Sequence, residues 1–136
     1  MAHDGRKELM VQFCIAYCGI LASHSICATN TTGRLVSEAT GLPMTLYMSC
    51  NQGGSQQIGS RIAYNELDLV LYFCDPSQTE EYHSSVMDIA RLCDQYNVPF
   101  ATNVATAEML IHGLERGDLD WREIMKARGA EQAGVI

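Results

Sequence analysis

The chain has 136 residues, which is long enough for one domain with a hydrophobic core and too short for two. Hydrophobic residues make up 47% and charged residues 18% of it, so the composition excludes a disordered chain. The net charge of −7, without any basic run, argues against nucleic acid as a partner. A small anionic ligand remains open, because salt screens distant charges and one local cation is enough to bind it.

Cysteine usage and hydropathy indicate the cellular compartment. The six cysteines are Cys14, Cys18, Cys27, Cys50, Cys74 and Cys93. They form no Cys-x-x-Cys pair and follow no signal peptide, so we expect reduced, buried thiols in a cytoplasmic protein, with no metal site. No apolar run is long enough to span a bilayer, so we expect no membrane partner.

The first half of the chain alternates helical and extended patterns. Apolar residues at helical spacing predict a helix from Glu8 to about Ala22, and a buried strand follows from His24 to Ala28. A threonine-rich turn opens a helix that runs to Ala39. Met44 to Met48 is predicted as the next strand, and it leads into a polar turn from Ser49 to Gln57.

The second half continues the alternation. In order, its predicted elements are a helix from about Ser55 to Glu66, a strand from Leu67 to Cys74, an irregular loop from Asp75 to about Ser84, a helix through Val86 and Cys93, a short strand from Pro99 to Thr102, a helix from Ala105 to Leu114, and a tail from Asp118 with a short helix around Trp121. The strand from Leu67 to Cys74 is the most apolar, which is typical of a central strand covered on both faces.

These patterns predict an α/β protein with a Rossmann-like parallel sheet and helices on both sides. We expect one domain over residues 1–136, with residues 118–136 as a divergent C-terminal tail. Ligands of such sheets bind at the carboxyl ends of the strands. That edge collects the polar turns at residues 29–32, 49–55, 75–84 and 103–106.

The turn Ala28-Thr29-Asn30-Thr31-Thr32-Gly33 has the features of a phosphate site. It places hydroxyls and unpaired backbone N–H groups at the start of a helix, where the helix dipole favours an anion. An ordinary capping turn uses the same residue types, because threonine is a good N-cap. The phosphate site is therefore favoured by the set of polar turns together and not by this turn alone.

Several motifs together resemble the methylglyoxal synthase family, from Ala2 to about Ile111. They are His3-Asp4 with Lys7, Ala28-Thr29-x-Thr31-Thr32-Gly33, Thr40-Gly41, Gly53-Gly54-x-Gln56-Gln57-x-Gly59, Asp75-Pro76, and Val98-Pro99-x-Ala101-Thr102-Asn103-x-Ala105-Thr106-Ala107. The resemblance implies a methylglyoxal-synthase-like three-layer α/β/α sandwich. It also implies a cytoplasmic, metal-free homohexamer without a cofactor, which converts dihydroxyacetone phosphate to methylglyoxal and inorganic phosphate.

The resemblance also assigns the binding residues. It implies that Lys7, Thr29, Thr31, Thr32 and Ser49 hold the phosphate, together with backbone N–H groups at Asn30 and Cys50. His3 corresponds to a ligand of a substrate oxygen, with the carboxylate of Asp4 beside it. The reaction needs a base for the proton next to the carbonyl, and donors that stabilise the enediolate while phosphate leaves.

The expected proton-transfer groups depart from the family pattern. Ser55 stands where the family has its catalytic Asp, and Ser85 stands in place of a second carboxylate. The expected histidine aligns with Tyr82, or with His83 if the loop shifts by one residue. Cys50 replaces a glycine of the phosphate loop. A serine hydroxyl is no base near neutral pH unless another group takes its proton.

Three interpretations follow. The chain is a phosphate-eliminating lyase whose base has moved, with Asp4, Asp75 and His83 as candidates; or it acts on another phosphorylated metabolite; or it is a non-catalytic sensor of a phosphorylated ligand. Asp75 has a simpler role as a residue that fixes the turn before Pro76.

The two ends of the chain depart from the family as well. Only Met1 and Ala2 precede His3, where family members have an apolar strand, so the rigid element that aims His3 and Lys7 is in question. Family sites are completed by an arginine from a neighbouring subunit. Arg122 and Arg128 are the candidates for it, and Arg91 is a further basic group without an assignment.

Overall fold

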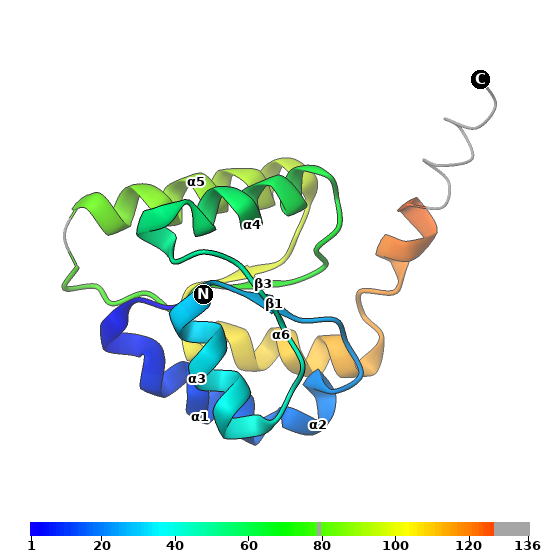
Figure 1. The fold of residues 1–136 in the computed structure, drawn as a ribbon. Helices are drawn as coiled ribbons and strands as arrows, with labels where there is room; N and C mark the ends of the chain where they lie inside the picture. Colours follow the sequence, from blue (N-terminus) through cyan, green and yellow to red (C-terminus); the bar gives the residue numbers. More distant parts are fainter. Residues whose placement is uncertain (79, 127–136) are drawn as a thin grey trace.

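The computed structural model describes residues 1–78 and 80–126, which form three layers (Figure 1). The strands are β1 (Cys27–Ala28), β2 (Thr45–Leu46), β3 (Val70–Leu71) and β4 (Phe100–Ala101). Helices α4 (Gly54–Ala63) and α5 (Glu80–Tyr96) cover one face, and α1 (Lys7–Ala16), α3 (Asn30–Thr40) and α6 (Val104–Arg116) cover the other. Three short helices, η1 (Asp4–Arg6), α2 (Cys18–Leu21) and η2 (Cys50–Gln52), complete the chain order. No helix in the described part has both the length and the apolar character that crossing a bilayer requires.

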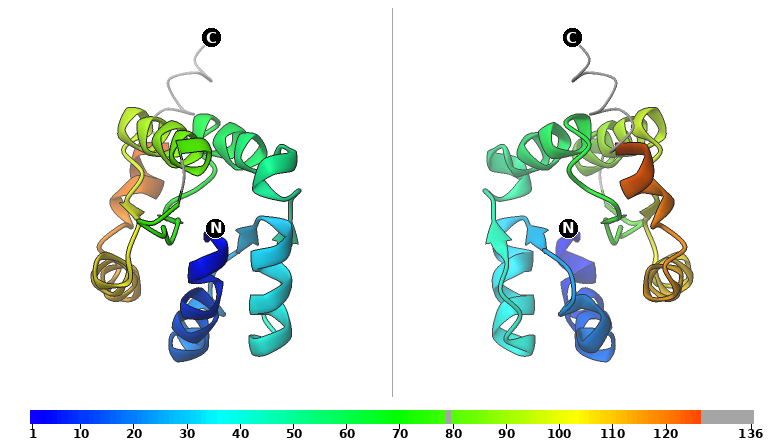
Figure 2. Two further views of the ribbon diagram at one scale, coloured as in Figure 1. Left: turned by 90° about the vertical axis from the view of Figure 1, so that its left-hand side faces the viewer. Right: turned by 90° about the vertical axis from the view of Figure 1, so that its right-hand side faces the viewer.

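All strand pairs are parallel, as the alternation of strands and helices predicts. β1 pairs with β2, and β3 pairs with β4, so the named strands form two separate pairs. A cavity of ≈ 530 Å³ is lined by residues of both β1 and β3. Figure 2 shows the two strand pairs on either side of the N-terminus.

The first residues of the chain lie along β3. They therefore supply the rigid element before His3 and Lys7 that the sequence left in question. Ala2 forms a parallel bridge with Phe73. The Met1 ammonium donates to the Leu71 carbonyl at 2.9 Å, and the His3 N–H donates to the Phe73 carbonyl at 2.9 Å. A strand-like segment therefore precedes His3 and fixes where η1 and α1 begin.

The predicted elements differ from the structure in three ways. The helix expected from Glu8 to Ala22 is divided at Tyr17 (φ −109°, ψ 22°) into α1 and α2, and α2 ends at Leu21. The predicted strands shrink to two paired residues each, while single backbone hydrogen bonds continue beyond them, such as the one from the Cys74 N–H to the Thr102 carbonyl. The loop predicted up to Ser84 is wrong from Glu80 onward, where α5 begins.

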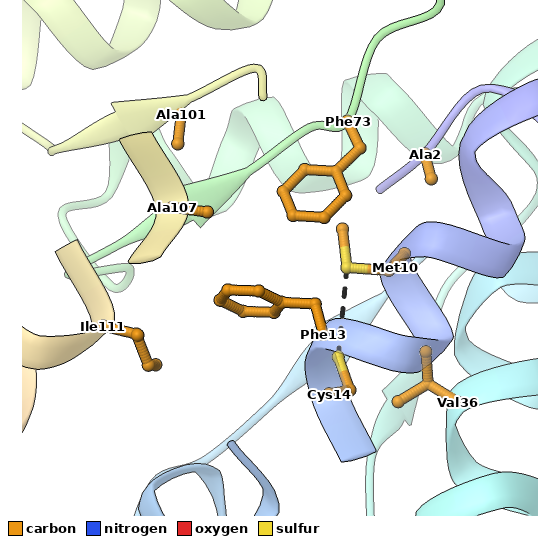
Figure 3. Close-up of a cluster of buried hydrophobic side chains, with 9 residues drawn as sticks. All are labelled: Ala2, Met10, Phe13, Cys14, Val36, Phe73, Ala101, Ala107 and Ile111. Carbon is orange, nitrogen blue, oxygen red and sulfur yellow. Dashed lines mark hydrogen bonds between the residues drawn. The ribbon is translucent and has the colours of Figure 1, made fainter. Parts of the chain in front are cut away.

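The core has one cluster on each face of the sheet. Figure 3 shows the cluster beside α1, α3 and α6, which comprises Ala2, Met10, Phe13, Cys14, Val36, Phe73, Ala101, Ala107 and Ile111. The other cluster includes Ile58, Ile62, Val70, Tyr72, Ile89, Cys93 and Val98. Side chains alternate along a strand, so Phe73 faces the first cluster while Tyr72 faces α4 and α5. The six cysteines are free, but only Cys14 and Cys93 are buried, so the prediction that all six are buried is wrong.

Residues 121–126 are helical and carry Arg122, whose side chain is only 3% exposed. Its guanidinium pairs with Asp68 at 3.2 Å and donates to the Asn65 side chain at 2.8 Å and to the Asn97 carbonyl. Arg122 is therefore bound within its own subunit, which contradicts the candidate role in a neighbouring site. Arg128 lies outside the described residues.

We expect the Arg122→Ala variant to lower the free energy of unfolding by about 2 kcal/mol, because several buried acceptors lose their donor at once. The loss is smaller than for a fully buried pair, since Asp68 is partly exposed and keeps Lys126 at 2.7 Å. Urea denaturation measures the change. Arg116→Ala is the matched control, because it removes an exposed ion pair with Asp118 and should cost less than about 0.5 kcal/mol.

Candidate functional site

A cavity of ≈ 330 Å³ lies where the carboxyl ends of the strands meet the start of the chain. Its lining comes from four segments: the start of the chain up to the first residue of α1, the turn between β1 and α3 with the start of α3, the end of the β2 loop with η2, and the residue after β3. The lining residues are Ala2, His3, Asp4, Lys7, Thr29, Thr31, Ser49, Cys50, Asn51, Gln52 and Tyr72. The predicted ligand-binding edge thus carries a cavity, but no described residue of the predicted turns at 75–84 and 103–106 is in its lining.

Two hydroxyl residues of the lining stand at helix starts. Thr29 is the N-cap of α3 and Ser49 is the N-cap of η2, both with extended backbone. In the described chain neither side chain donates to or accepts from its helix at the cap position, so both hydroxyls remain for a ligand. With Thr31 they surround the N-terminus of α3, where the helix dipole favours an anion.

The two glycines before Ser55 shape the loop that carries Ser49 and Cys50. Gly53 has φ 103°, a conformation that a side chain disfavours. A Cβ on Gly54 would lie 1.9 Å from the Met48 carbonyl oxygen, so only glycine lets α4 start this close to the end of β2. The Gly-Gly motif therefore places η2 over the cavity.

Lys7 is the one cation of the cavity lining among the described residues. Its ammonium donates to the Ala2 carbonyl at 2.7 Å and to the Thr32 hydroxyl at 3.2 Å. Thr32 is buried and outside the lining, so it positions Lys7 instead of lining the cavity. Lys7 also lies 3.4 Å from the carboxylate of Asp4.

His3 is 5% exposed, and its Nδ1 accepts the Asp75 backbone N–H at 2.8 Å. Burial lowers the pKa of the His3 imidazole, so the ring is neutral near neutral pH. Because Nδ1 is an acceptor, the proton of the neutral ring is on Nε2. His3 is therefore a hydrogen-bond donor at Nε2 and not a base. Its ring meets the Tyr72 ring edge to face, with centroids 5.4 Å apart.

The lowered pKa of His3 gives a pH dependence with a definite sign. Below the unfolded value of 6.5 the unfolded chain binds a proton that the folded chain resists, so folding stability falls as the pH falls. We expect the free energy of unfolding to drop more steeply from about pH 7.5 to about pH 5.5 in the wild type than in His3→Asn. The asparagine oxygen still accepts the Asp75 N–H. Equal slopes in urea denaturation at each pH would contradict the assignment.

The two candidate carboxylates, Asp4 and Asp75, lie in different positions relative to the cavity. Asp4 lines the cavity and its side chain is 82% exposed. Asp75 is outside the lining, and its carboxylate accepts the Ser77 backbone N–H at 2.9 Å and the Ser77 hydroxyl at 2.7 Å. These hydrogen bonds lower the pKa of Asp75. Asp75 thus fixes the turn before α5, as its simpler interpretation states.

Other candidates from the sequence lie away from the cavity. Ser55 is in the first turn of α4 and lines a different cavity, of ≈ 310 Å³, between α4 and α5. Asn30 is not in the lining, and its backbone N–H points to the Met48 carbonyl at 3.5 Å. Arg91 is exposed on α5. The side chains of Tyr82 and His83 lie outside the described residues.

Sequence reasoning did not single out Tyr72, Asn51 or Gln52 as site residues. Asn51 and Gln52 lie within the polar turn that the sequence marks, so the sequence could have identified them as site residues. Tyr72 gave no signal, because it belongs to the most apolar run of the chain. Within the described residues, no group of three or more His, Cys, Asp and Glu side chains is arranged to hold a metal ion.

Comparisons with known proteins identify similar sequences and a similar solved structure. The model of the MGS-like domain family matches residues 10–102. A methylglyoxal synthase from Caldicellulosiruptor saccharolyticus is 53% identical over 128 residues, which cover 94% of this chain and 91% of the relative. One from Geobacillus thermodenitrificans is 50% identical, with 94% and 89% covered. The crystal structure of methylglyoxal synthase from Elizabethkingia anophelis matches with a TM-score of 0.72 and 34% identity, covering 82% of this chain and 73% of that one.

Proposed function

The chain belongs to the MGS-like domain family, and from this premise we propose that it eliminates inorganic phosphate from dihydroxyacetone phosphate or a closely related phosphorylated carbonyl compound. Its α/β fold is that of the methylglyoxal synthases, and it is an enzyme of the lyase class. One observation carries the proposal: a single cavity holds Lys7, Thr29, Thr31 and Ser49 together with a carboxylate. We call these four residues the anion-binding set.

The anion-binding set suits the phosphate end of the substrate. Lys7 supplies a cation that is already held by Ala2 and Thr32, so little order is lost when a ligand binds. The hydroxyls of Thr29, Thr31 and Ser49 add donors around a helix N-terminus. A dianionic phosphate can therefore pair with the Lys7 ammonium and accept hydrogen bonds from the hydroxyls at the same site.

The chemistry then needs a base, and we assign this role to Asp4, the one carboxylate in the cavity lining among the described residues. Asp4 takes a proton from the hydroxymethyl carbon next to the carbonyl, which leaves an enediolate. His3 donates from Nε2 to the oxygen where negative charge develops. The proton of the adjacent hydroxyl moves to the enolate oxygen, an aldehyde carbonyl forms, and its electron pair breaks the carbon–oxygen bond to phosphate. The leaving phosphate takes the proton held by Asp4, and the products are inorganic phosphate and the enol of methylglyoxal.

The assignment explains how a lyase site can exist with serine at position 55. A base must lie within reach of the proton that it removes. Ser55 lines the cavity between α4 and α5, whereas Asp4 follows directly on the strand-like segment along β3. The base has thus moved from the start of α4 to the start of the chain.

We propose further that the protein works in the cytoplasm as a metal-independent homohexamer, as its family resemblance implies. The exposed apolar side chains Leu35, Leu46 and Met48, on α3 and along β2, suit a contact between subunits. Analytical ultracentrifugation tests the oligomeric state, and activity in the presence of a chelator tests the need for metal.

The deciding experiment measures phosphate release from dihydroxyacetone phosphate by the wild type and by Ser55→Asp, with Ser60→Asp as the control for an added charge on α4. Release by the wild type, with methylglyoxal as the second product, supports the proposal. Release only by Ser55→Asp overturns Asp4 as the base and indicates that the wild type has a changed substrate. No release from any variant, with thermal stabilisation by phosphorylated metabolites, indicates a sensor. No stabilisation by any of them overturns the phosphate site.

A further inference from the structure

Tyr72 is an unassigned polar group in the wall of the cavity. It follows β3 directly, it is 1% exposed, and its backbone N–H donates to the Ala101 carbonyl at 2.9 Å, which fixes the residue in the sheet. Its side chain passes toward the α4 and α5 layer and lines the cavity beside His3 and Cys50. A buried hydroxyl needs hydrogen-bond partners.

The Tyr72 hydroxyl has two such partners, on different elements. It lies 3.3 Å from the Ser85 hydroxyl on α5 and 3.8 Å from the Cys50 sulfur on η2. Both distances are longer than a strong O–H···O bond, and the thiol is a weak partner. The Tyr72 proton is therefore easily turned toward a better acceptor.

The protonation state of Tyr72 is also favourable for a donor. Burial raises the pKa of its phenol, so the hydroxyl keeps its proton throughout the range in which proteins are active. Ser85 stands where the family resemblance implies a carboxylate. A carboxylate would hold the phenol proton as a permanent acceptor, whereas the serine hydroxyl both donates and accepts. Ser85 can donate to the Tyr72 oxygen while Tyr72 donates to a ligand.

We propose that the Tyr72 hydroxyl is a second donor, beside His3, to the carbonyl oxygen of the bound substrate, and that Ser85 is the residue that positions it. Tyr72 exchanges no proton with the substrate: its hydrogen bond shortens as negative charge grows on that oxygen, and it stabilises the enediolate. The inference deepens the proposed function, on which it rests. It places recognition of the carbonyl end on β3 and α5, and recognition of the phosphate end on α1 and α3.

The test uses Tyr72→Phe, which keeps the ring and removes only the hydroxyl. We expect kcat for phosphate release to fall about 10²-fold, the effect of losing one such donor. By calorimetry, affinity for inorganic phosphate should stay unchanged, while affinity for 2-phosphoglycolate, whose carboxylate stands in for the enediolate, should fall about tenfold or more. Tyr96→Phe on the same layer is the control and should change neither affinity.

Ser85→Ala separates positioning from packing. Ser85→Ala should lower kcat and the affinity for 2-phosphoglycolate, each by a smaller factor than Tyr72→Phe does. In a Tyr72→Phe background it should cause no further loss, because Ser85 acts through Tyr72. Additive effects would overturn the role of Ser85. Unchanged kcat and 2-phosphoglycolate affinity in Tyr72→Phe, or equal loss of affinity for inorganic phosphate, would overturn the role of Tyr72.

The two proposals fail in different ways. A wild type without phosphate release refutes the proposed function, yet the calorimetric comparison of 2-phosphoglycolate with inorganic phosphate still decides the role of Tyr72. A wild type that binds inorganic phosphate and does not bind 2-phosphoglycolate refutes the Tyr72 proposal. A wild type that releases phosphate at the same rate as Tyr72→Phe refutes it while the proposed function stands.

Discussion

Asp4→Asn is expected to lower kcat for phosphate release about 10²- to 10⁴-fold, because it removes the base and keeps the shape of the side chain. KM should stay unchanged or fall, since Lys7 loses a carboxylate 3.4 Å away that competes with the phosphate. Steady-state kinetics of phosphate release measures both constants. The expected pattern is the one for a group that acts in the transition state and not in binding.

Two variants control this result. Glu8→Gln removes an exposed carboxylate outside the cavity lining and should leave kcat unchanged. Asp75→Asn tests the competing candidate; its carboxylate is held by Ser77, so we expect a change in stability with little change in kcat. If Asp75→Asn loses more activity than Asp4→Asn, the assignment of the base is wrong.

Lys7→Met is expected to raise KM and the dissociation constant of inorganic phosphate about 10²-fold. Hydrogen bonds between charged groups contribute about 1.5–3 kcal/mol, and Lys7 is the one cation of the cavity lining in the described part of the chain. Methionine keeps the length and apolar stem of lysine, so the local packing is retained. Isothermal calorimetry with phosphate measures the loss directly.

The control for Lys7→Met is Arg91→Met, which removes one positive charge from an exposed site on α5. Both variants change the net charge equally, so only a local effect separates them. If both variants weaken phosphate binding equally, the net charge of the protein sets the affinity, and Lys7 makes no specific contribution to the site. Retained binding in Lys7→Met would remove the central support of the anion-binding set.

Much of the fold follows from short-range pattern. The spacing of apolar residues predicts the α/β class, and the match to the methylglyoxal synthase structure confirms it. The threonine turn before α3 and the glycine turn at the start of α4 lie where the sequence places them, because helix starts and the positive φ of Gly53 are local requirements. The break at Tyr17 and the start of α5 at Glu80 were not predicted, since element boundaries depend on packing that local propensity does not contain.

Some residues of the site could likewise be predicted from the sequence, and others could be assigned only from the structure. Thr29, Thr31 and Ser49 stand at carboxyl ends of strands, and the rule for parallel sheets brings them together without any coordinates. Separating Asp4 from Asp75 and Ser55 required the structure. All three lie in or near polar turns, and only the packing of the start of the chain along β3 puts Asp4 into the cavity.

By itself, the order of residues determined the class of fold and predicted the edge at which a ligand binds and the anionic nature of that ligand, because helix starts, glycine turns and strand alternation are short-range properties. Tertiary structure alone decided the state of three side chains. Asp75 sets the tautomer of His3 from 72 positions away, Asp68 holds Arg122 across 54 positions, and Ser85 meets the Tyr72 hydroxyl between two layers. Such contacts depend on which elements pack together, and no local pattern encodes that choice.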